Sequence, residues 1–446
     1  MPYIPHSHED TQAMLEVLEL QADALFQEIP AHLKSNDWSG VPDAIDELTL
    51  LQLAKKRAQR NPLLSFLGAG AYEHYIPPAV WALCGRGEFY SAYTPYQAEA
   101  SQGTLKSLYE YQTMMARLTA LEVANAGLYD GATALAEALL MALRLQKGKD
   151  TILLPQALHP HYRQVIQSLV PAVLHFVPFH KETGQLDQAS FTDGLSDRVA
   201  AVVLPLPNFF GIVENPHQLT DLAHEKGALV IALVNPLALA ILTPPGQWGT
   251  KGADIAVGEG QPLGLPLSAG GPYIGFMATK MPYVRHMPGR IVGRTKDMEG
   301  KDGFVLTLQA REQHIRRGKA TSNICTNQGL MALANTIYLA YMGDQGLFEV
   351  ASRCHENSNL LLEKLSGIKG VQSVFKAAFF HEMVLKLEKP AQSILEVMRK
   401  EGLIGGYALE ETFPELGYAL LCCTTETKTP EDIECYAAAL EKALSG

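Results

Sequence analysis

The stretch "VAAVVLPLPNFFGIVENPHQLTDLAHEKGALVIALV", residues 199–234, decides the fold. It contains two apolar runs, 199–207 and 228–234, separated by a segment of helical composition that includes "HQLTDLAHEKG". A strand that is apolar along its whole length is buried on both faces, which is typical of parallel sheets covered by helices. The stretch therefore predicts a strand, a helix and a second strand of one parallel sheet.

Similar apolar segments occur on both sides of this stretch. They occupy residues 151–155, 173–179, 254–259 and 273–279. The first four of the six segments are separated by sequences of helical composition, such as "HPHYRQVIQSLV". Strands that alternate with helices in this way predict a doubly wound α/β fold with a mostly parallel sheet.

The remaining sequence predicts two smaller parts. Residues 1–65 contain helical repeats and are expected to form an N-terminal helical arm. The large α/β domain is expected to cover residues 66–345. After it, three short apolar segments alternate with two helical ones, which predicts a small α+β domain over 346–446.

Composition excludes several classes of function. The chain has 446 residues, with 36 Lys and Arg against 47 Asp and Glu, and a net charge of −11, which argues against nucleic acid and anionic membrane surfaces as partners. Its six cysteines form no CxxC pair, so neither a disulfide framework nor a metal site is predicted. No apolar run reaches the roughly 20 residues of a membrane span, and the N-terminus does not resemble a signal peptide. We therefore expect a cytoplasmic protein.

Residues 254–276, "DIAVGEGQPLGLPLSAGGPYIGF", join two of the apolar segments by a Gly-rich loop. In many enzymes that use pyridoxal phosphate, such a loop carries the lysine that holds the cofactor. Here Gln261 stands where that lysine is expected, nine residues before Gly270. Because glutamine forms no Schiff base, covalent catalysis of this kind is not expected from this chain.

The strand that ends near residue 234 also differs from a cofactor strand. In such enzymes a carboxylate after this strand keeps the pyridinium nitrogen protonated. Residues 228–242 contain no Asp or Glu, and Asn235 is the nearest polar side chain. The favoured interpretation is a buried strand after which Asn235 and Pro236 turn the chain.

Residues 128–143, "LYDGATALAEALLMAL", begin a strong helix. The backbone amides of Gly131, Ala132 and Thr133 could hold a phosphate at the helix start. Alternatively, Asp130 or Thr133 caps the helix. The sequence leaves both interpretations open.

Two further segments carry candidate contacts. Residues 87–103, "GEFYSAYTPYQAEASQG", place tyrosines on an irregular segment, either as a contact surface or as a small core cluster. Residues 311–329, "REQHIRRGKATSNICTNQG", could clamp an anion or form a solvated helix end.

The motifs "YTPYQAEASQG", "YDGATALAEAL", "GEGQPLGLPLSAGGPYIGF" and "REQHIRRGKATSNIC" resemble those of the glycine decarboxylase P-protein family, in its first-subunit form. The resemblance covers residues 5–440. It implies the aminotransferase-like fold type I of pyridoxal phosphate enzymes. Ala98 and Ala100 depart from the Pro and Ile expected in the first motif, which puts the local conformation of that loop in doubt.

The resemblance also implies a division of labour between two subunits. The second subunit carries the lysine and the cofactor, and the pair decarboxylates glycine and passes the aminomethyl group to the lipoyl arm of the H-protein. The first subunit completes the partner's pocket and the lipoyl channel, and the assembly is expected to be a dimer of heterodimers. The resemblance suggests these contact residues in this chain: Tyr93, Thr94, Tyr96, Gln97, His314 and Asn323.

Two other hypotheses stay open at this stage. The chain could be an independent pyridoxal phosphate enzyme that uses Lys251, Lys280 or Lys319. It could also be a structural partner without any part in an active site.

Overall fold

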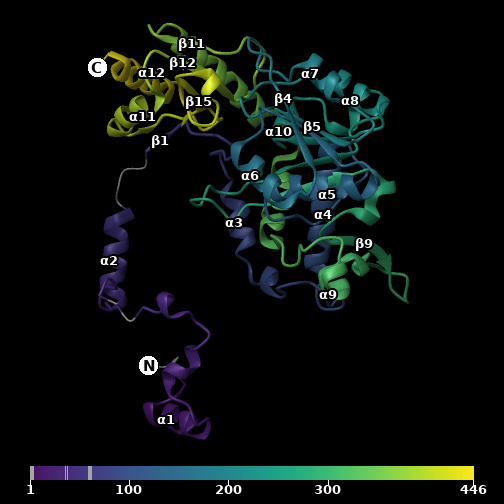
Figure 1. The fold of residues 1–446 in the computed structure, drawn as a ribbon, viewed down its shortest axis with the longest axis vertical. Helices are drawn as coiled ribbons and strands as arrows, with labels where there is room; N and C mark the ends of the chain where they lie inside the picture. The colour runs from purple at the N-terminus through teal and green to yellow at the C-terminus, as the bar shows by residue number, and fades with distance from the viewer. Residues whose placement is uncertain (1–4, 36, 38, 59–62, 446) are drawn as a thin grey trace. The chain divides into compact units, whose positions relative to one another are not determined.

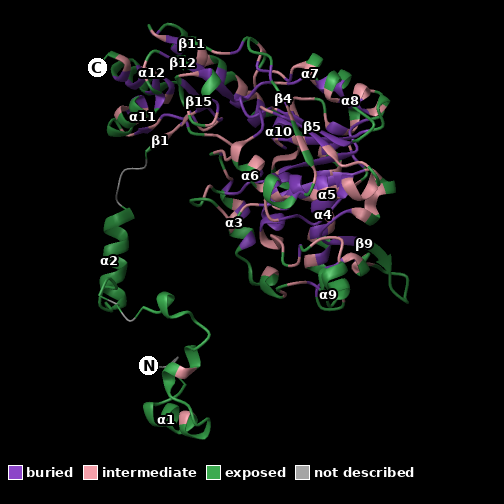
Figure 2. Ribbon diagram, in the orientation of Figure 1, coloured by how far each residue is buried: buried purple, intermediate pink, exposed green. Residues whose placement is uncertain are grey.

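The computed structural model describes residues 5–35, 37, 39–58 and 63–445, and the chain forms two compact units, 1–62 and 63–446. The first unit contains the helices α1 (His8–Val17) and α2 (Glu47–Ala58). Ser7 caps α1, since its hydroxyl accepts the backbone N–H of Asp10. Both helices lack buried residues, and Figure 2 draws them almost wholly as exposed. Helices thus occur in the predicted arm, although its boundary at residue 65 stays a prediction.

The second unit is built on a seven-stranded sheet in the order β2-β8-β7-β6-β5-β3-β4. Two of these strands, β4 and β5, are labelled in Figure 1. Five neighbouring strands are parallel, and β8 and β2 pair antiparallel at one edge. The strands are β2 (Val123–Ala124), β3 (Thr151–Pro155), β4 (Val173–Val177), β5 (Val199–Leu206), β6 (Leu229–Val234), β7 (Ile255–Glu259) and β8 (Gly275–Thr279). The predicted mostly parallel sheet is confirmed.

Helices cover both faces of this sheet. On one face, α5 (Gly131–Leu145) and α6 (Pro160–Leu169) pack on side chains such as Ile152, Val203 and Ile231. On the other face lie α4 (Gln102–Thr119), α7 (Gln188–Gly194), α8 (Pro216–Glu225) and α10 (Gly329–Ser366). All eight residues of β5 are buried, as a strand between two helical layers requires (Figure 2). The doubly wound fold is therefore confirmed.

The C-terminal part contains an antiparallel sheet of four strands, ordered β11-β12-β15-β14. These strands are β11 (Val371–Ser373), β12 (Glu382–Leu387), β14 (Tyr407–Ala408) and β15 (Ala419–Cys423). The helices α11 (Ala391–Lys400) and α12 (Pro430–Ser445) pack against it. Because residues 63–446 form a single compact unit, the predicted boundary between residues 345 and 346 stays a prediction. A break in α10 at Gly343, with φ 61° and ψ −172°, lies close to it.

Several short elements complete the unit. They are α3 (Pro78–Cys84), α9 (Gln313–Arg316), the parallel pair β1 (Leu64–Ser65) and β13 (Leu403–Ile404), and the hairpin β9 (Ile291–Lys296) with β10 (Asp302–Thr307). The buried amide of Gln112 on α4 fixes the hairpin, since it accepts from the backbone N–H of Val292 and donates to the carbonyl of the same residue. The hairpin therefore begins at a defined place beside α4.

Among the described residues, no helix combines the length and the apolar character needed to cross a bilayer. All six cysteines are free, and only Cys435 is exposed.

Candidate functional site

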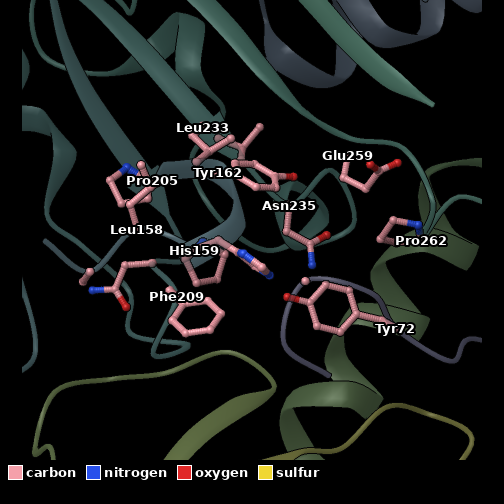
Figure 3. Close-up of a pocket in the computed structure, with 15 residues that line it drawn as sticks. Tyr72, Leu158, His159, Tyr162, Pro205, Phe209, Leu233, Asn235, Glu259 and Pro262 are labelled. Atoms are coloured by element: carbon pink, nitrogen blue, oxygen red, sulfur yellow. The ribbon is translucent and has the colours of Figure 1, made fainter. Parts of the chain in front are cut away.

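A cavity of about 90 Å³ lies at the carboxyl ends of the parallel strands. This edge of an open α/β sheet is where ligands bind in such folds. The cavity is lined by Gly70, Tyr72, Ala157, Leu158, His159, Tyr162, Pro205, Pro207, Asn208, Phe209, Leu233, Val234, Asn235, Glu259 and Pro262. In Figure 3 the polar ends of Tyr72, His159 and Asn235 face one another across it.

His159 provides a neutral aromatic ring at this cavity. It precedes α6, its Nδ1 accepts the backbone N–H of His161 at 3.1 Å, and its Nε2 lies 2.9 Å from the carbonyl of Ala69. Burial lowers the pKa of His159 to about 4. The imidazole is thus held without charge at neutral pH, with its orientation fixed through both nitrogens.

Asn235 follows β6 directly and turns the chain. Its Oδ1 accepts the backbone N–H of Leu237 at 3.0 Å, and its Nδ2 lies 3.3 Å from Nε2 of His381. The predicted turn after the buried strand is therefore confirmed. A neutral amide at this position provides no negative charge for a pyridinium nitrogen.

Glu259, at the end of β7, contacts the helix start for which the sequence leaves a phosphate site and a helix cap as alternatives. Its Oε2 accepts the backbone N–H of Gly131 at 2.9 Å, and its Oε1 accepts those of Gln261 and Ile274 at 3.1 and 3.2 Å. Burial raises the pKa of Glu259 to about 7. A carboxyl group of the protein itself therefore accepts a hydrogen bond from an N-terminal backbone amide of α5.

The capping interpretation of residues 130–133 also holds. The Asp130 carboxylate accepts the backbone N–H of Thr133 at 2.8 Å, and the Thr133 hydroxyl accepts the backbone N–H of Asp130 at 3.2 Å. Of the predicted phosphate ligands Gly131, Ala132 and Thr133, the first and third thus donate their N–H groups to carboxylates of the chain. Phosphate binding there stays a prediction, and it would require a change in these bonds.

Gln261 is 1% exposed and is held by the loop around it. Its amide exchanges two hydrogen bonds with the backbone of Tyr72, at 2.9 and 2.8 Å, and donates to the carbonyl of Leu265 at 2.8 Å. Gln261 does not line the cavity, whereas its neighbour Pro262 does. The glutamine therefore acts as a structural link between residues 72 and 265.

None of the three alternative lysines lines the cavity. The Nζ of Lys280 donates to Asp254 at 2.7 Å, just before β7 begins, whereas the cavity lies where β7 ends. Because the five residues of β7 span about 16 Å, Lys280 and the cavity are separated by the length of this strand. Lys251 is exposed in the loop before β7, and Lys319 is exposed in the segment after α9.

Taken together, these side chains do not fit pyridoxal phosphate. The cavity lining contains no lysine, the residue after β6 carries no charge, and Glu259 occupies an amide of the α5 terminus. What remains of a cofactor site is the ring of His159 and the shape of the strand ends.

A second polar region joins the tyrosine segment to residues 311–328. The Tyr93 hydroxyl lies 3.4 Å from Oγ1 of Thr326, and the Tyr96 ring contacts the ring of His314 at a centroid distance of 5.1 Å. Thr94 accepts a bond from Arg290 at 3.4 Å. The structure thus brings Tyr93, Thr94, Tyr96 and His314 into one region.

The other two predicted contact residues have fewer contacts with the rest of the described chain. Gln97 and Asn323 are exposed, and neither side chain forms a hydrogen bond within the described part of the chain. Arg311 in the basic segment binds the backbone carbonyls of Met287 and Gly289, so this cation supports the fold. The sequence pattern does not indicate Arg290 or Asn327, whose side chains form a hydrogen bond of 3.0 Å in this region.

The comparisons with known proteins decide the family. The model of the glycine cleavage system P-protein family matches residues 1–440. The chain belongs to the glycine cleavage system P-protein family.

Relatives of the P-protein family match over the full length. A protein of Nitrosospira multiformis, named probable glycine dehydrogenase (decarboxylating) subunit 1, is 56% identical over 449 residues, which is 100% of this chain and 99% of that protein. A protein of Nitrosomonas europaea with the same name is 54% identical over 450 residues, with the same coverage. This P-protein chain is thus an enzyme subunit of the glycine-decarboxylating type, and the name of its relatives implies a second subunit.

Solved structures agree with this assignment and with the predicted fold type I. A crystal structure of glycine decarboxylase (P-protein) of the glycine cleavage system, in inhibitor-bound form, matches with a TM-score of 0.85 and 41% identity over 100% of both chains. A Lactobacillus brevis glutamate decarboxylase matches with a TM-score of 0.68 and 12% identity, over 95% of this chain and 96% of the other, which shows the fold alone.

Proposed function

We propose that this P-protein chain acts as the subunit without the Schiff-base lysine in a two-subunit glycine decarboxylase. The second subunit holds pyridoxal phosphate, which supplies an electron sink when bound. The observation that carries the proposal is the state of this chain's own cavity, where Glu259 binds the Gly131 amide and no lysine is present.

In this proposal the chain's contribution lies in the region of Tyr93, Thr94, Tyr96 and His314. Tyr93 is 87% exposed and Tyr96 is 46% exposed. Aromatic rings with polar tips on an exposed segment are the side chains that protein interfaces favour. We propose that they shape the partner's pocket and the channel for the lipoyl arm of the H-protein, together with Gln97 and Asn323.

The proposed assembly is a dimer of heterodimers in the cytoplasm. In it, glycine binds on the second subunit, and the aminomethyl group leaves on the lipoyl arm of the H-protein. Support comes from the subunit name of the relatives, which implies a partner chain, and from the six cysteines, which form no disulfide.

The test measures release of CO2 from glycine by the complex reconstituted with the second subunit, pyridoxal phosphate and H-protein. Tyr96→Ala is expected to lower kcat/KM about tenfold or more, because a ring at the interface of a shared site is lost. Tyr341→Ala serves as the matched control, since Tyr341 is an exposed tyrosine (64%) on α10 outside this region. Circular dichroism establishes that both variants are folded.

Full activity after replacement of both Tyr93 and Tyr96 would remove these residues from the proposal. Full glycine turnover by the second subunit without this chain would favour a purely structural role. Cofactor retained by the isolated chain, and lost on changing Lys251, Lys280 or Lys319, would favour an independent enzyme.

A further inference from the structure

Arg290 is a buried cation without an anionic partner. It lies directly before β9 and is 5% exposed. None of the ion pairs within the described part of the chain includes it. A buried guanidinium that lacks a counter-charge is costly, so such a group usually meets an anion.

The protein provides acceptors for only some of the N–H donors of this guanidinium. One terminal nitrogen donates to Oδ1 of Asn327 at 3.0 Å, and the other donates to the carbonyl of Cys325 at 2.7 Å and to Oγ1 of Thr94 at 3.4 Å. The Nε–H is buried and has no acceptor. Because a guanidinium has five N–H donors and three are used, two have no acceptor within the protein.

These contacts also fix the direction of the side chain. The Arg290 guanidinium carbon lies 5.7 Å from the centre of the Tyr96 ring. Asn327 in turn donates to the carbonyls of Ala126 and Gly127, at 3.3 and 3.2 Å, so the acceptor that holds Arg290 is itself held. The guanidinium is preorganised, which reduces the entropy lost when it binds a ligand.

Arg290 lines a cavity of about 420 Å³, distinct in its lining from the one at the strand ends. It is the single charged residue of this lining, and neutral hydroxyl and amide groups accompany it. The polar lining residues include Tyr93, Thr104, Ser107, Arg290, Thr326 and Asn327. With one positive charge and no carboxylate, the lining favours an anionic ligand.

The N-terminus of α10 lies at the same cavity. Gln328, Gly329 and Leu330 line it, and the 38-residue helix starts at Gly329 without a side-chain cap. The first amides of a helix carry partial positive charge and point out of its end. They therefore add N–H donors to the cavity that Arg290 lines.

We propose that this cavity is a binding site for a small oxyanion, a carboxylate or phosphoryl group, held by Arg290 and the N-terminus of α10. The site itself does not depend on the proposed function. Only the natural source of the anion rests on it: the carboxylate of the substrate glycine or a phosphoryl group. Tyr93 lines this cavity and Thr94 accepts a hydrogen bond from Arg290, so the site adjoins the segment that we propose as the contact with the second subunit.

The test is calorimetric titration of the full isolated chain with inorganic phosphate and, separately, with acetate, at constant ionic strength. Arg290→Gln is expected to raise the Kd of the bound anion by about tenfold to a hundredfold, as expected for loss of charge-assisted hydrogen bonds. Arg294→Gln is the matched control, because Arg294 lies on β9, four residues after Arg290, with its side chain exposed, and this substitution is expected to leave the Kd unchanged. Preference for acetate points to a carboxylate source, and preference for phosphate to a phosphoryl source.

Absence of binding to the wild-type chain, or equal Kd values for wild type and Arg290→Gln, would overturn the proposal. If Arg290→Gln does not fold, crystals of the wild-type chain soaked in selenate decide the question. An anomalous selenium peak within hydrogen-bonding distance of Arg290 supports the site, and absence of a peak there overturns it. Both measurements are independent of where the cofactor binds. The anion site can therefore be refuted without refuting the proposed function, and the reverse is also true.

Discussion

Gln261 holds the loop between β7 and β8 through its buried side chain. Its side chain joins Tyr72 to Leu265 through three hydrogen bonds in the interior. The sequence indicates that a lysine is absent at this position. It does not indicate that the amide is used for structure, because its partners are backbone groups 189 and 4 residues away.

Loss of the Gln261 amide is expected to destabilise the fold. Gln261→Ala leaves the N–H and carbonyl of Tyr72 and the carbonyl of Leu265 without this partner, and should lower the free energy of unfolding by about 2 kcal/mol. Urea denaturation measures the effect. The control Gln164→Ala changes an exposed glutamine on α6 and should stay within about 0.5 kcal/mol of wild type. A Gln261→Ala chain as stable as the control would contradict this account.

Glu259 should make the stability of the chain depend on pH. Burial raises its folded pKa from 4.5 to about 7, so the folded chain keeps a proton that the unfolded chain releases. The stability contributed by this group is therefore present below pH 4.5 and decreases as pH rises through 7, by up to about 3 kcal/mol. Glu259→Gln removes this contribution.

Urea denaturation of wild type and Glu259→Gln between pH 5 and 8 tests the sign. The stability of wild type relative to the variant should decrease as pH rises to about 7 and then level off. A relative stability that stays constant over this range would mean that the carboxylate is ionised in the folded chain at all these pH values, and would contradict the raised pKa.

The tyrosine segment illustrates what the sequence shows at the level of single residues and what it does not. Tyr93 and Tyr96 stand out because aromatic side chains are unusual in an irregular polar segment. Arg290 does not stand out, because "PGRIVGR" looks like an ordinary strand start. Its importance comes from burial without a counter-charge, which depends on packing between segments about 200 residues apart.

At the scale of elements, the six apolar segments found in the sequence all form strands of the main sheet, with ends that differ by at most two residues. They could be predicted because buried strands are apolar on both faces. The two-residue strand β2 is too short to carry such a pattern. The hairpin β9–β10 is not predicted from the sequence for another reason, since its outer half is polar and exposed.

The junction between β7 and α5 gives a prediction for an element contact. A Cβ at Gly131 would collide with the Tyr162 hydroxyl and approach Glu259 to 3.0 Å, because helix and strand meet closely there. Gly131→Ala should therefore destabilise the fold by about 1–3 kcal/mol. The free energy of unfolding measures it.

Gly103 on α4 is the matched control for this substitution. A Cβ there meets no atom within 4 Å, so Gly103→Ala should leave stability unchanged or raise it by up to about 1 kcal/mol. Equal effects of the two substitutions would mean that the contact between α5 and β7 is not tight.

At the scale of the whole molecule, the chain has the complete fold of a pyridoxal phosphate enzyme, while its own strand-end cavity lacks the groups that hold the cofactor. The fold could be predicted from apolar periodicity, and the family from four motifs. The hydrogen bond between Glu259 and the N-terminal amide of α5 could not be predicted from the sequence, because it joins residues 128 positions apart. A chain of this kind is expected to work as one half of a shared site.

Borohydride reduction followed by intact mass measurement tests this claim most directly. The chain is treated alone, and mixed with its second subunit, in the presence of pyridoxal phosphate. The account predicts that the mass of the reduced cofactor is found on the second subunit only. A cofactor mass on this chain would contradict it, because a lysine of this chain would then hold the cofactor.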